Sequence, residues 1–348
     1  MKTNLTLSDF DYELPDELIA KYPVSGRDGS RMLVLDRKNG NVEHKHFYDF
    51  VDYLNEGDVL VLNNTKVIPA RLLGKKETGA KIEIFLCRPL ENNLWSALIK
   101  NSKRLKTGDI VKISDELKVL IKEKKEAKEG NIPEHTVELL YKGTNPDEVL
   151  NKFGSIPLPP YMQREATEKD KETYQTVYAK ISGSVAAPTA GLHFTEEILN
   201  KIEEKRVQIC YITLNVGLGT FLPVKCEDIN NHKMHTESYV ISKETADIIN
   251  NKKGKLISVG TTTTRCLESA YQKFGKIVEC KDETDIFIYP PYEFKVTEGL
   301  LTNFHLPKST LLMLISAFSD RETILNTYKT AVDNKYRFFS YGDCMFIK

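Results

Sequence analysis

Apolar and polar positions follow two different periods along this chain, and the change of period divides it into three stretches. The first contains a short helix PDELIAKY, a hairpin turning at Asn39-Gly40, a helix YDFVDYL and an apolar strand DVLVLN. After Asn64 the chain changes to short strand-like runs at close spacing. Beyond about Asn145, helical and strand patterns alternate. The chain therefore combines an α/β part with an all-β part.

The middle stretch predicts a small antiparallel barrel or sandwich. The alternation that follows favours an α/β layer that returns to the sheet begun by the first stretch. We therefore expect a layered α/β main domain, residues 1–64 plus 147–348, with an inserted small antiparallel β-barrel, residues 65–146. The predicted barrel strands are ARLLG, KIEIFLCR, LWSALIK, DIVKI, LKVLIKEK and HTVELLYK.

Helix boundaries in the last stretch carry their own signals. Thr195 is suited to cap the helix EEILNKIEEKR, and Gly275 to end the helix TTTRCLESAYQKF. Further helices are expected at STLLMLISAFS and RETILNTYKTAVDNKY, followed by a last strand within FFSYGDCMFIK.

Composition excludes several classes of protein. Lys plus Arg and Asp plus Glu both total 49, so any nucleic-acid contact must be a local patch. The six cysteines lack C-x-x-C spacing, which is typical of reduced cytosolic thiols. The N-terminus has no apolar segment for secretion, and 18 consecutive apolar residues occur nowhere. We expect a cytoplasmic protein without a membrane partner.

Two strings suggest a nucleotide or anion site. LNVGLGTF has Gly217 and Gly219 after a strand, but the following TFLPV is extended, so a tight turn is favoured over a dinucleotide loop. In SVGTTTTRC a strand enters a helix start that holds Thr261, Thr262 and Arg265, which could bind an anion. The alternative is that one threonine only caps the helix.

Two histidines lie in strings that could line a cavity. His193 ends the small-residue string SVAAPTAGLH, where Gly191 allows close approach to a ligand. His305 lies near Asn303 and Lys308 in LLTNFHLPKST. Either histidine could move a proton, or could be a satisfied core residue.

Three other features have two interpretations each. YRFFSYGD has Arg337 and Asp343 around a turn, where exposed aromatic rings could stack on a base or pack as a hairpin. The Lys-rich ELKVLIKEKKEAKEG could contact RNA or be a solvated hairpin tip. HKMH suggests a metal site, which we reject because no other ligand set converges on it.

Together these strings closely resemble one family, the S-adenosylmethionine:tRNA ribosyltransferase-isomerases of queuosine synthesis. The resemblance spans nearly the whole chain, and strings this long in the same order are highly specific. It is carried by DFDYELPDELIAKYP, RDGSRMLVLDR, LNNTKVIPARLLGKK, PLPPYMQR, YQTVYAKISGSVAAPTAGLHFT, VGLGTF, HKMHTESY, VGTTTTRCLES, TDIFIYPPYEF, LLTNFHLPKSTLLML and YRFFSYGDCMFI.

The resemblance implies transfer and isomerisation of the ribosyl group of S-adenosylmethionine onto 7-aminomethyl-7-deazaguanine in tRNA, giving epoxyqueuosine. Adenine and methionine leave, S-adenosylmethionine is consumed, and no cofactor or metal is required. It also implies an α/β domain with an inserted barrel. One position departs from the family, which usually has His where this chain has Asn215. That departure puts in doubt any indispensable base at this position.

This chemistry needs two groups that handle protons. The candidates are His193 and His305, with Asp343 as an alternative base. We expect Arg265 and the threonines to hold an anion and the chain to be a monomer. The candidate substrate-binding residues are Arg265, Thr261, Thr262, Asn303, Lys308, Gly191 and Arg337. The competing functions are non-catalytic RNA binding and ordinary S-adenosylmethionine-dependent methyl transfer, although no glycine-rich strand-loop-helix supports the second.

Overall fold

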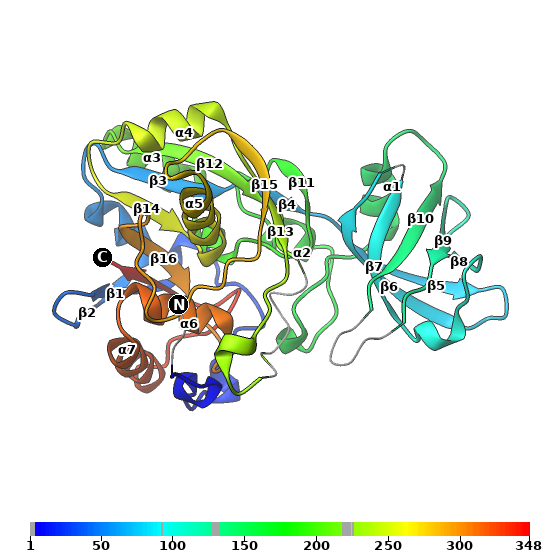
Figure 1. The fold of residues 1–348 in the computed structure, drawn as a ribbon, viewed down its shortest axis with the longest axis horizontal. Coiled ribbons are helices and arrows are strands. Elements are labelled where there is room, and N and C mark those ends of the chain that lie inside the picture. Colours follow the sequence, from blue (N-terminus) through cyan, green and yellow to red (C-terminus); the bar gives the residue numbers. More distant parts are fainter. Residues whose placement is uncertain (1–3, 92, 127–132, 218–223, 225) are drawn as a thin grey trace.

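The computed structural model describes residues 4–91, 93–126, 133–217, 224 and 226–348. These residues form a large α/β body and a smaller β-barrel beside it, as the sequence predicts (Figure 1). The body is built from chain segments on both sides of the barrel. Within the described residues, no helix is long and apolar enough to cross a membrane.

The body is organised around a mixed sheet that has nine strands in the described chain, in the order β15-β13-β12-β3-β14-β16-β17-β1-β2. The four central strands, β12, β3, β14 and β16, run parallel. A parallel strand covered on both faces is apolar throughout, as VLVLN of β3 is. The bounds are β1 Arg31–Asp36, β2 Asn41–His46, β3 Val59–Asn63, β12 Gln208–Leu214, β13 Glu237–Ile241, β14 Leu256–Val259, β15 Cys280–Thr284, β16 Gly299–Asn303 and β17 Cys344–Ile347.

Helices cover both faces of this sheet. Leu60 and Leu62 of β3 pack in one cluster with α3, whereas Val59 and Val61 pack in another with α4 and α5. Thr195 caps α3 through its side chain and Gly275 ends α5 with a φ of 72°, as predicted. The bounds of the α-helices are α1 Pro146–Phe153, α2 Asp170–Thr173, α3 Glu196–Glu204, α4 Lys243–Asn250, α5 Thr261–Phe274, α6 Thr310–Phe318 and α7 Arg321–Asp333. Of these, α1 packs on the barrel and not on the sheet of the body.

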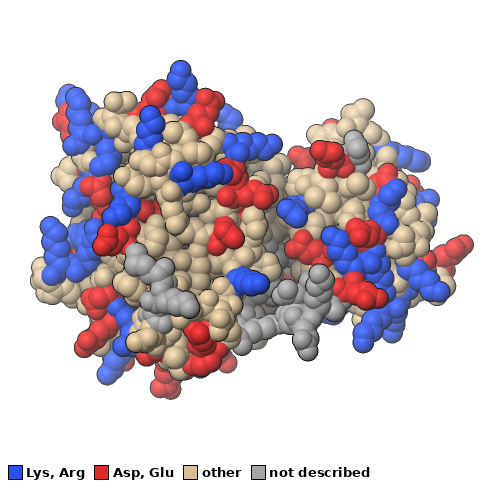
Figure 2. Space-filling model, in the orientation of Figure 1, with Lys and Arg blue, Asp and Glu red and all other residues tan. Residues whose placement is uncertain are grey.

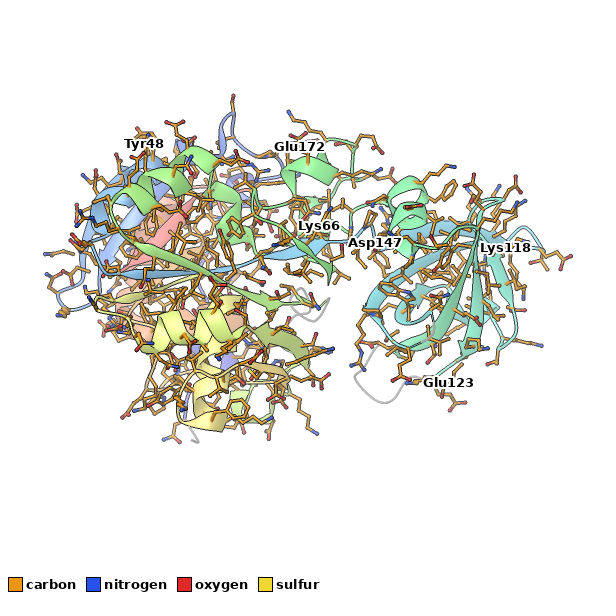
Figure 3. All side chains as sticks on the ribbon, turned by 90° about the horizontal axis from the view of Figure 1, so that it is seen from above. Tyr48, Lys66, Lys118, Glu123, Asp147 and Glu172 are labelled. Atoms are coloured by element: carbon orange, nitrogen blue, oxygen red, sulfur yellow. The ribbon has the colours of Figure 1, made fainter. Side chains whose placement is uncertain are left out.

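The barrel closes in the order β10-β7-β6-β5-β8-β9, with every pair antiparallel. It is joined to the body by β4 (Thr65–Val67) and β11 (Ile181–Ser184), which pair in parallel. Lys66 of β4 and Asp147 of α1 mark this junction in Figure 3. The bounds are β5 Arg71–Lys76, β6 Lys81–Pro89, β7 Leu94–Lys100, β8 Ile110–Lys112, β9 Leu117–Glu123 and β10 His135–Tyr141.

Two of the predicted helices are 3-10 helices. The segment expected as YDFVDYL is the 3-10 helix Phe47–Tyr53. Its three residues per turn place Phe47 and Phe50 one above the other, and both are fully buried. PDELIAKY forms only Asp16–Leu18, because the Ala20 N–H then donates to the carbonyl of Phe338. Tertiary contacts therefore override both helical patterns. The other 3-10 helices of the described residues are Leu7–Phe10, Arg27–Gly29, Ser102–Arg104, Pro160–Met162, Thr189–His193 and Ile229–Asn231.

The last strand lies within the segment predicted for it. Only Cys344–Ile347 pairs with the sheet, and YRFFSYGD before it forms a turn region. Its aromatic side chains are buried, which excludes exposed stacking rings, one of the two interpretations that the sequence left open. These aromatic side chains are packed inside the protein.

Candidate active site

A pocket lies at the carboxyl ends of the parallel strands β14 and β16, the usual place for a ligand in an α/β sheet. Its volume is about 100 Å³. Closed sites for small molecules are typically roughly 300–1,000 Å³, so a nucleoside-sized ligand would lie partly at the mouth. The lining residues are Tyr161, Ala186–Ala190, Val216, Gly260–Thr262, Thr302–Leu306, Ser309, Leu311, Phe339 and Ser340.

The start of α5 contributes the predicted Thr261 and Thr262 to this pocket. The helix is capped by Gly260, whose φ is 88°, so no threonine serves as its N-cap. The next two threonines, Thr263 and Thr264, donate to carbonyls four residues earlier. The hydroxyl of Thr262 is buried and has no partner among the described residues. It is therefore available to a ligand.

His305 lines the same pocket and is held firmly by its surroundings. Its backbone N–H bonds to the Tyr328 hydroxyl at 2.9 Å, and Tyr12 donates to its carbonyl. The ring Nε2 pairs with the Thr302 hydroxyl at 2.8 Å. Burial lowers the pKa of His305 to about 3, so the ring is neutral at physiological pH. A neutral imidazole at a pocket wall is able to accept a proton.

His193 lies behind the pocket wall and is separated from the lining by Asn303. Its Nε2 is 3.1 Å from the Asn303 Nδ2, and its Nδ1 is 2.6 Å from the Ser30 hydroxyl. Burial, with smaller contributions from Arg337 and Arg27, lowers its pKa to about 3. Both ring nitrogens of His193 therefore have hydrogen-bond partners. Of His193 and Asn303, only Asn303 lines the pocket.

Asp343 and Arg337 form a turn beside the pocket without lining it. The Asp343 carboxylate accepts the backbone N–H groups of Arg31 and Arg337 at 3.0 and 2.8 Å. The Arg337 guanidinium donates to the carbonyls of Tyr341 and Tyr22. These contacts give both residues structural partners.

Arg265 does not line the pocket. It is 4% exposed and is paired with the equally buried Glu237 of β13, while its Nε donates to the Ile286 carbonyl. The neighbouring threonines reach the pocket because they lie on the first turn of α5, whereas Arg265 lies on the next turn. The structure thus separates the two parts of the predicted anion site.

Gly191 and Lys308 also lie outside the lining. A Cβ at Gly191 would be 2.0 Å from the Tyr178 hydroxyl, so this glycine allows two protein segments to pack closely. Lys308 is exposed and pairs with Asp11 at 2.8 Å. The small residues that do line the pocket are Ala186, Ala187 and Ala190, from the string that the sequence analysis singled out.

Of the three barrel lysines predicted to contact RNA, two have internal partners. Lys122 pairs with Glu138 at 3.3 Å, and Lys124 donates to the Leu105 carbonyl at 3.0 Å. Lys125 is exposed. The rest of that predicted loop, residues 127–130, lies outside the described residues.

A row of lysines on the barrel was missed by sequence reasoning. Lys81, Lys75, Lys112 and Lys118 are direct register neighbours across β6, β5, β8 and β9, and all four are exposed. We call these four residues the lysine row; Lys118 is labelled in Figure 3. Finding it required the strand register, because the four residues are scattered in sequence. Figure 2 shows basic side chains gathered on the barrel.

Three remaining strings lie outside the pocket or contribute only one residue to it. Gly219 and most of LNVGLGTF fall outside the described residues, while Val216 lines the pocket. Asn215 accepts from the Thr65 hydroxyl at 2.9 Å, which ties β12 to the junction with the barrel. In the described part of the chain, no three His, Cys, Asp or Glu side chains gather as a metal site would require.

Comparison with known proteins places the chain in a family. The model of the family described as queuosine biosynthesis protein matches residues 7–347. A relative from Sulfurihydrogenibium, named S-adenosylmethionine:tRNA ribosyltransferase-isomerase, is 58% identical over 99% of this chain and 100% of its own length. One of the same name from Fusobacterium nucleatum is 53% identical over 99% and 98%.

A solved structure agrees with these relatives. The crystal structure of S-adenosylmethionine tRNA ribosyltransferase from Thermotoga maritima is 35% identical, with a TM-score of 0.54 over 98% of this chain and all of that one. The fold, the full-length family match and the identities above agree with one another. The chain therefore belongs to the queuosine biosynthesis family of S-adenosylmethionine:tRNA ribosyltransferase-isomerases.

Proposed function

We propose that this protein transfers and isomerises the ribosyl moiety of S-adenosylmethionine onto 7-aminomethyl-7-deazaguanine in tRNA, giving epoxyqueuosine-tRNA, adenine and methionine. S-adenosylmethionine is a consumed co-substrate, and no other cofactor or metal takes part. The protein acts as a cytoplasmic monomer. The observation that carries this proposal is the family match from residue 7 to 347, with relatives of that name covered over nearly their whole length.

The chemistry needs a proton acceptor beside the ribose. The sulfonium makes the adjacent 5′ carbon acidic, so a base that removes this proton starts the loss of adenine. The bonds from the ribose to adenine and to sulfur both break, and the sugar forms one bond to the aminomethyl nitrogen and one new bond within itself that closes the isomerised ring. The electron pair of the carbon–sulfur bond leaves with methionine, adenine leaves with the proton taken from the 5′ carbon, and the aminomethyl group releases one proton. His305 is the best-placed acceptor because it is a neutral imidazole in the pocket lining.

The RNA substrate fits the charge of the barrel. Lysines directly opposite one another repel, so the lysine row is favourable only if an anion lies against it. Of its four members, Lys112 pairs with Asp115 at 2.5 Å. A groove of about 660 Å³ runs beside the row and is lined by Lys75, Lys81 and Lys112. We assign this surface to phosphates of the tRNA.

The fate of isotopic label tests the reaction type. With S-adenosylmethionine labelled in the ribose, label should enter a tRNA that carries the modified base, and not a tRNA that lacks it. With label in the methyl group, the tRNA should remain unlabelled. Methyl label in the RNA would indicate a methyltransferase, and no transfer of either label would indicate a binding protein.

A further inference from the structure

We propose that His193 is a positioning residue, which fixes the side-chain amide of Asn303 so that its oxygen accepts a hydrogen bond from an uncharged N–H or O–H group of the nucleoside part of S-adenosylmethionine. This inference rests on the proposed function for the identity of the ligand. It assigns His193 a role different from the proton carrier that its sequence context suggests.

The polarity of the hydrogen-bond chain is set by a carbonyl at each end. The Asn303 Nδ2 lies 3.4 Å from the backbone carbonyl of Asp343, which can only accept, so this atom is the amide nitrogen. The same nitrogen lies 3.1 Å from the His193 Nε2, which must therefore accept as well. The His193 proton consequently lies on Nδ1.

The hydrogen bonds keep the same donor-to-acceptor direction on the other side of the His193 ring. The His193 Nδ1–H donates to the Ser30 hydroxyl at 2.6 Å, and this hydroxyl donates to the Arg27 carbonyl at 3.3 Å. Ser30, His193 and Asn303 are 1%, 4% and 2% exposed, so water does not compete for these bonds. Each member of the chain has one orientation that satisfies its neighbours.

This chain of hydrogen bonds leaves one polar atom of Asn303 without a partner. The Asn303 Oδ1 is buried and accepts no hydrogen bond among the described residues, although Asn303 lines the pocket. A buried polar atom without a partner costs about 1–3 kcal/mol, which favours a ligand that supplies a donor. The unpartnered Thr262 hydroxyl in the same lining adds a second polar atom for that ligand.

Nearby charge indicates which kind of donor fits. The guanidinium groups of Arg27 and Arg337 are close enough to disfavour a positive charge on His193. Alanines and Val216 supply apolar walls that suit a base or sugar. The donor is therefore an amino or hydroxyl group of the nucleoside.

Substitutions of His193 by the two amides separate positioning from proton transfer. In His193→Gln the side-chain oxygen reaches the place of Nε2 and can still accept from Asn303. His193→Asn is the matched control, because its shorter side chain reaches only the place of Nδ1. We expect H193Q to keep the wild-type Kd for S-adenosylmethionine within about threefold, and H193N to weaken it about tenfold, the effect of one hydrogen bond.

Binding is measured by calorimetry on the full chain without RNA, and turnover and its pH profile are measured separately. We expect H193Q to retain the wild-type pH profile. If H193Q binds as weakly as H193N, or binds normally but loses turnover as a missing proton carrier would, the inference is wrong. If the wild-type protein binds S-adenosylmethionine but transfers no ribosyl group to the tRNA, the proposed function is wrong. The comparison of the Kd values of H193Q and H193N would still test the positioning role.

Discussion

His305 combines a fixed position with a neutral ring, and both follow from its surroundings. Hydrogen bonds from Tyr12 and to Tyr328 hold its backbone, and burial opposes protonation of the imidazole. Burial makes the imidazole a weak base and its protonated form short-lived, so a proton that it accepts must pass on to a leaving group in the same cycle. The residue is thus suited to shuttle a proton within one catalytic cycle.

His305→Ala should therefore lower kcat by about a hundredfold or more, the usual effect of losing a general acid or base. His46 is the control, since it is exposed and stacks on Tyr48 at the sheet edge. His46→Ala should retain the wild-type kcat. Steady-state kinetics with melting curves check both variants, and a folded H305A enzyme of near-normal kcat would remove His305 from the mechanism.

At the scale of elements, the buried pair between Arg265 of α5 and Glu237 of β13 joins a helix to the sheet it covers. Glu237 also accepts the Gly217 N–H at 3.2 Å, so the pair lies beside the strand end that leads to the pocket. Removing one partner of such a pair leaves an uncompensated buried charge. The pair is thus more important for stability than an exposed one.

Arg265→Ala should lower the free energy of unfolding by about 3–5 kcal/mol. The matched control is Arg206→Ala, which breaks the exposed pair with Glu56 and should cost less than about 1 kcal/mol. Denaturant unfolding of both variants measures the difference. A stable R265A protein that fails to bind S-adenosylmethionine would favour an anion-binding role over the structural one.

The sequence predicted most elements and four residues of the pocket lining, for a common reason. Strand ends and helix starts are local features, and the parallel order of β14 and β16 brings Thr261, Thr262, Asn303 and His305 together at one edge. The direction of each side chain is not local. It depends on partners distant in sequence, such as Glu237 for Arg265 and Ser30 for His193.

At the scale of the whole molecule, the pocket and the lysine row lie on different parts of the fold. The pocket lies at the edge of the body sheet, whereas the row crosses four strands of the barrel. β4 and β11 join the two parts. A tRNA is long enough to contact both, so we assign chemistry to the body and part of the RNA affinity to the barrel.

Two triple variants of the barrel compare its lysines. Replacing Lys75, Lys81 and Lys118 with Gln should weaken tRNA binding and reduce the slope of log K against log salt by about two to three. It should also stabilise the barrel slightly, since like charges are removed from paired strands. Replacing Lys122, Lys124 and Lys125 should have the smaller effect on binding, because two of them have internal partners. Salt titrations with equal or reversed effects would contradict this assignment.

The products of one reaction test the central claim most directly. With S-adenosylmethionine and a tRNA carrying 7-aminomethyl-7-deazaguanine, the enzyme should release adenine and methionine in equal amounts, with one modified base for each pair. Neither product should form without the RNA, because the ribosyl group then has no acceptor. Chromatography of the small molecules and mass spectrometry of the digested tRNA give all three quantities. S-adenosylhomocysteine as the main product, with a methylated tRNA, would contradict the account.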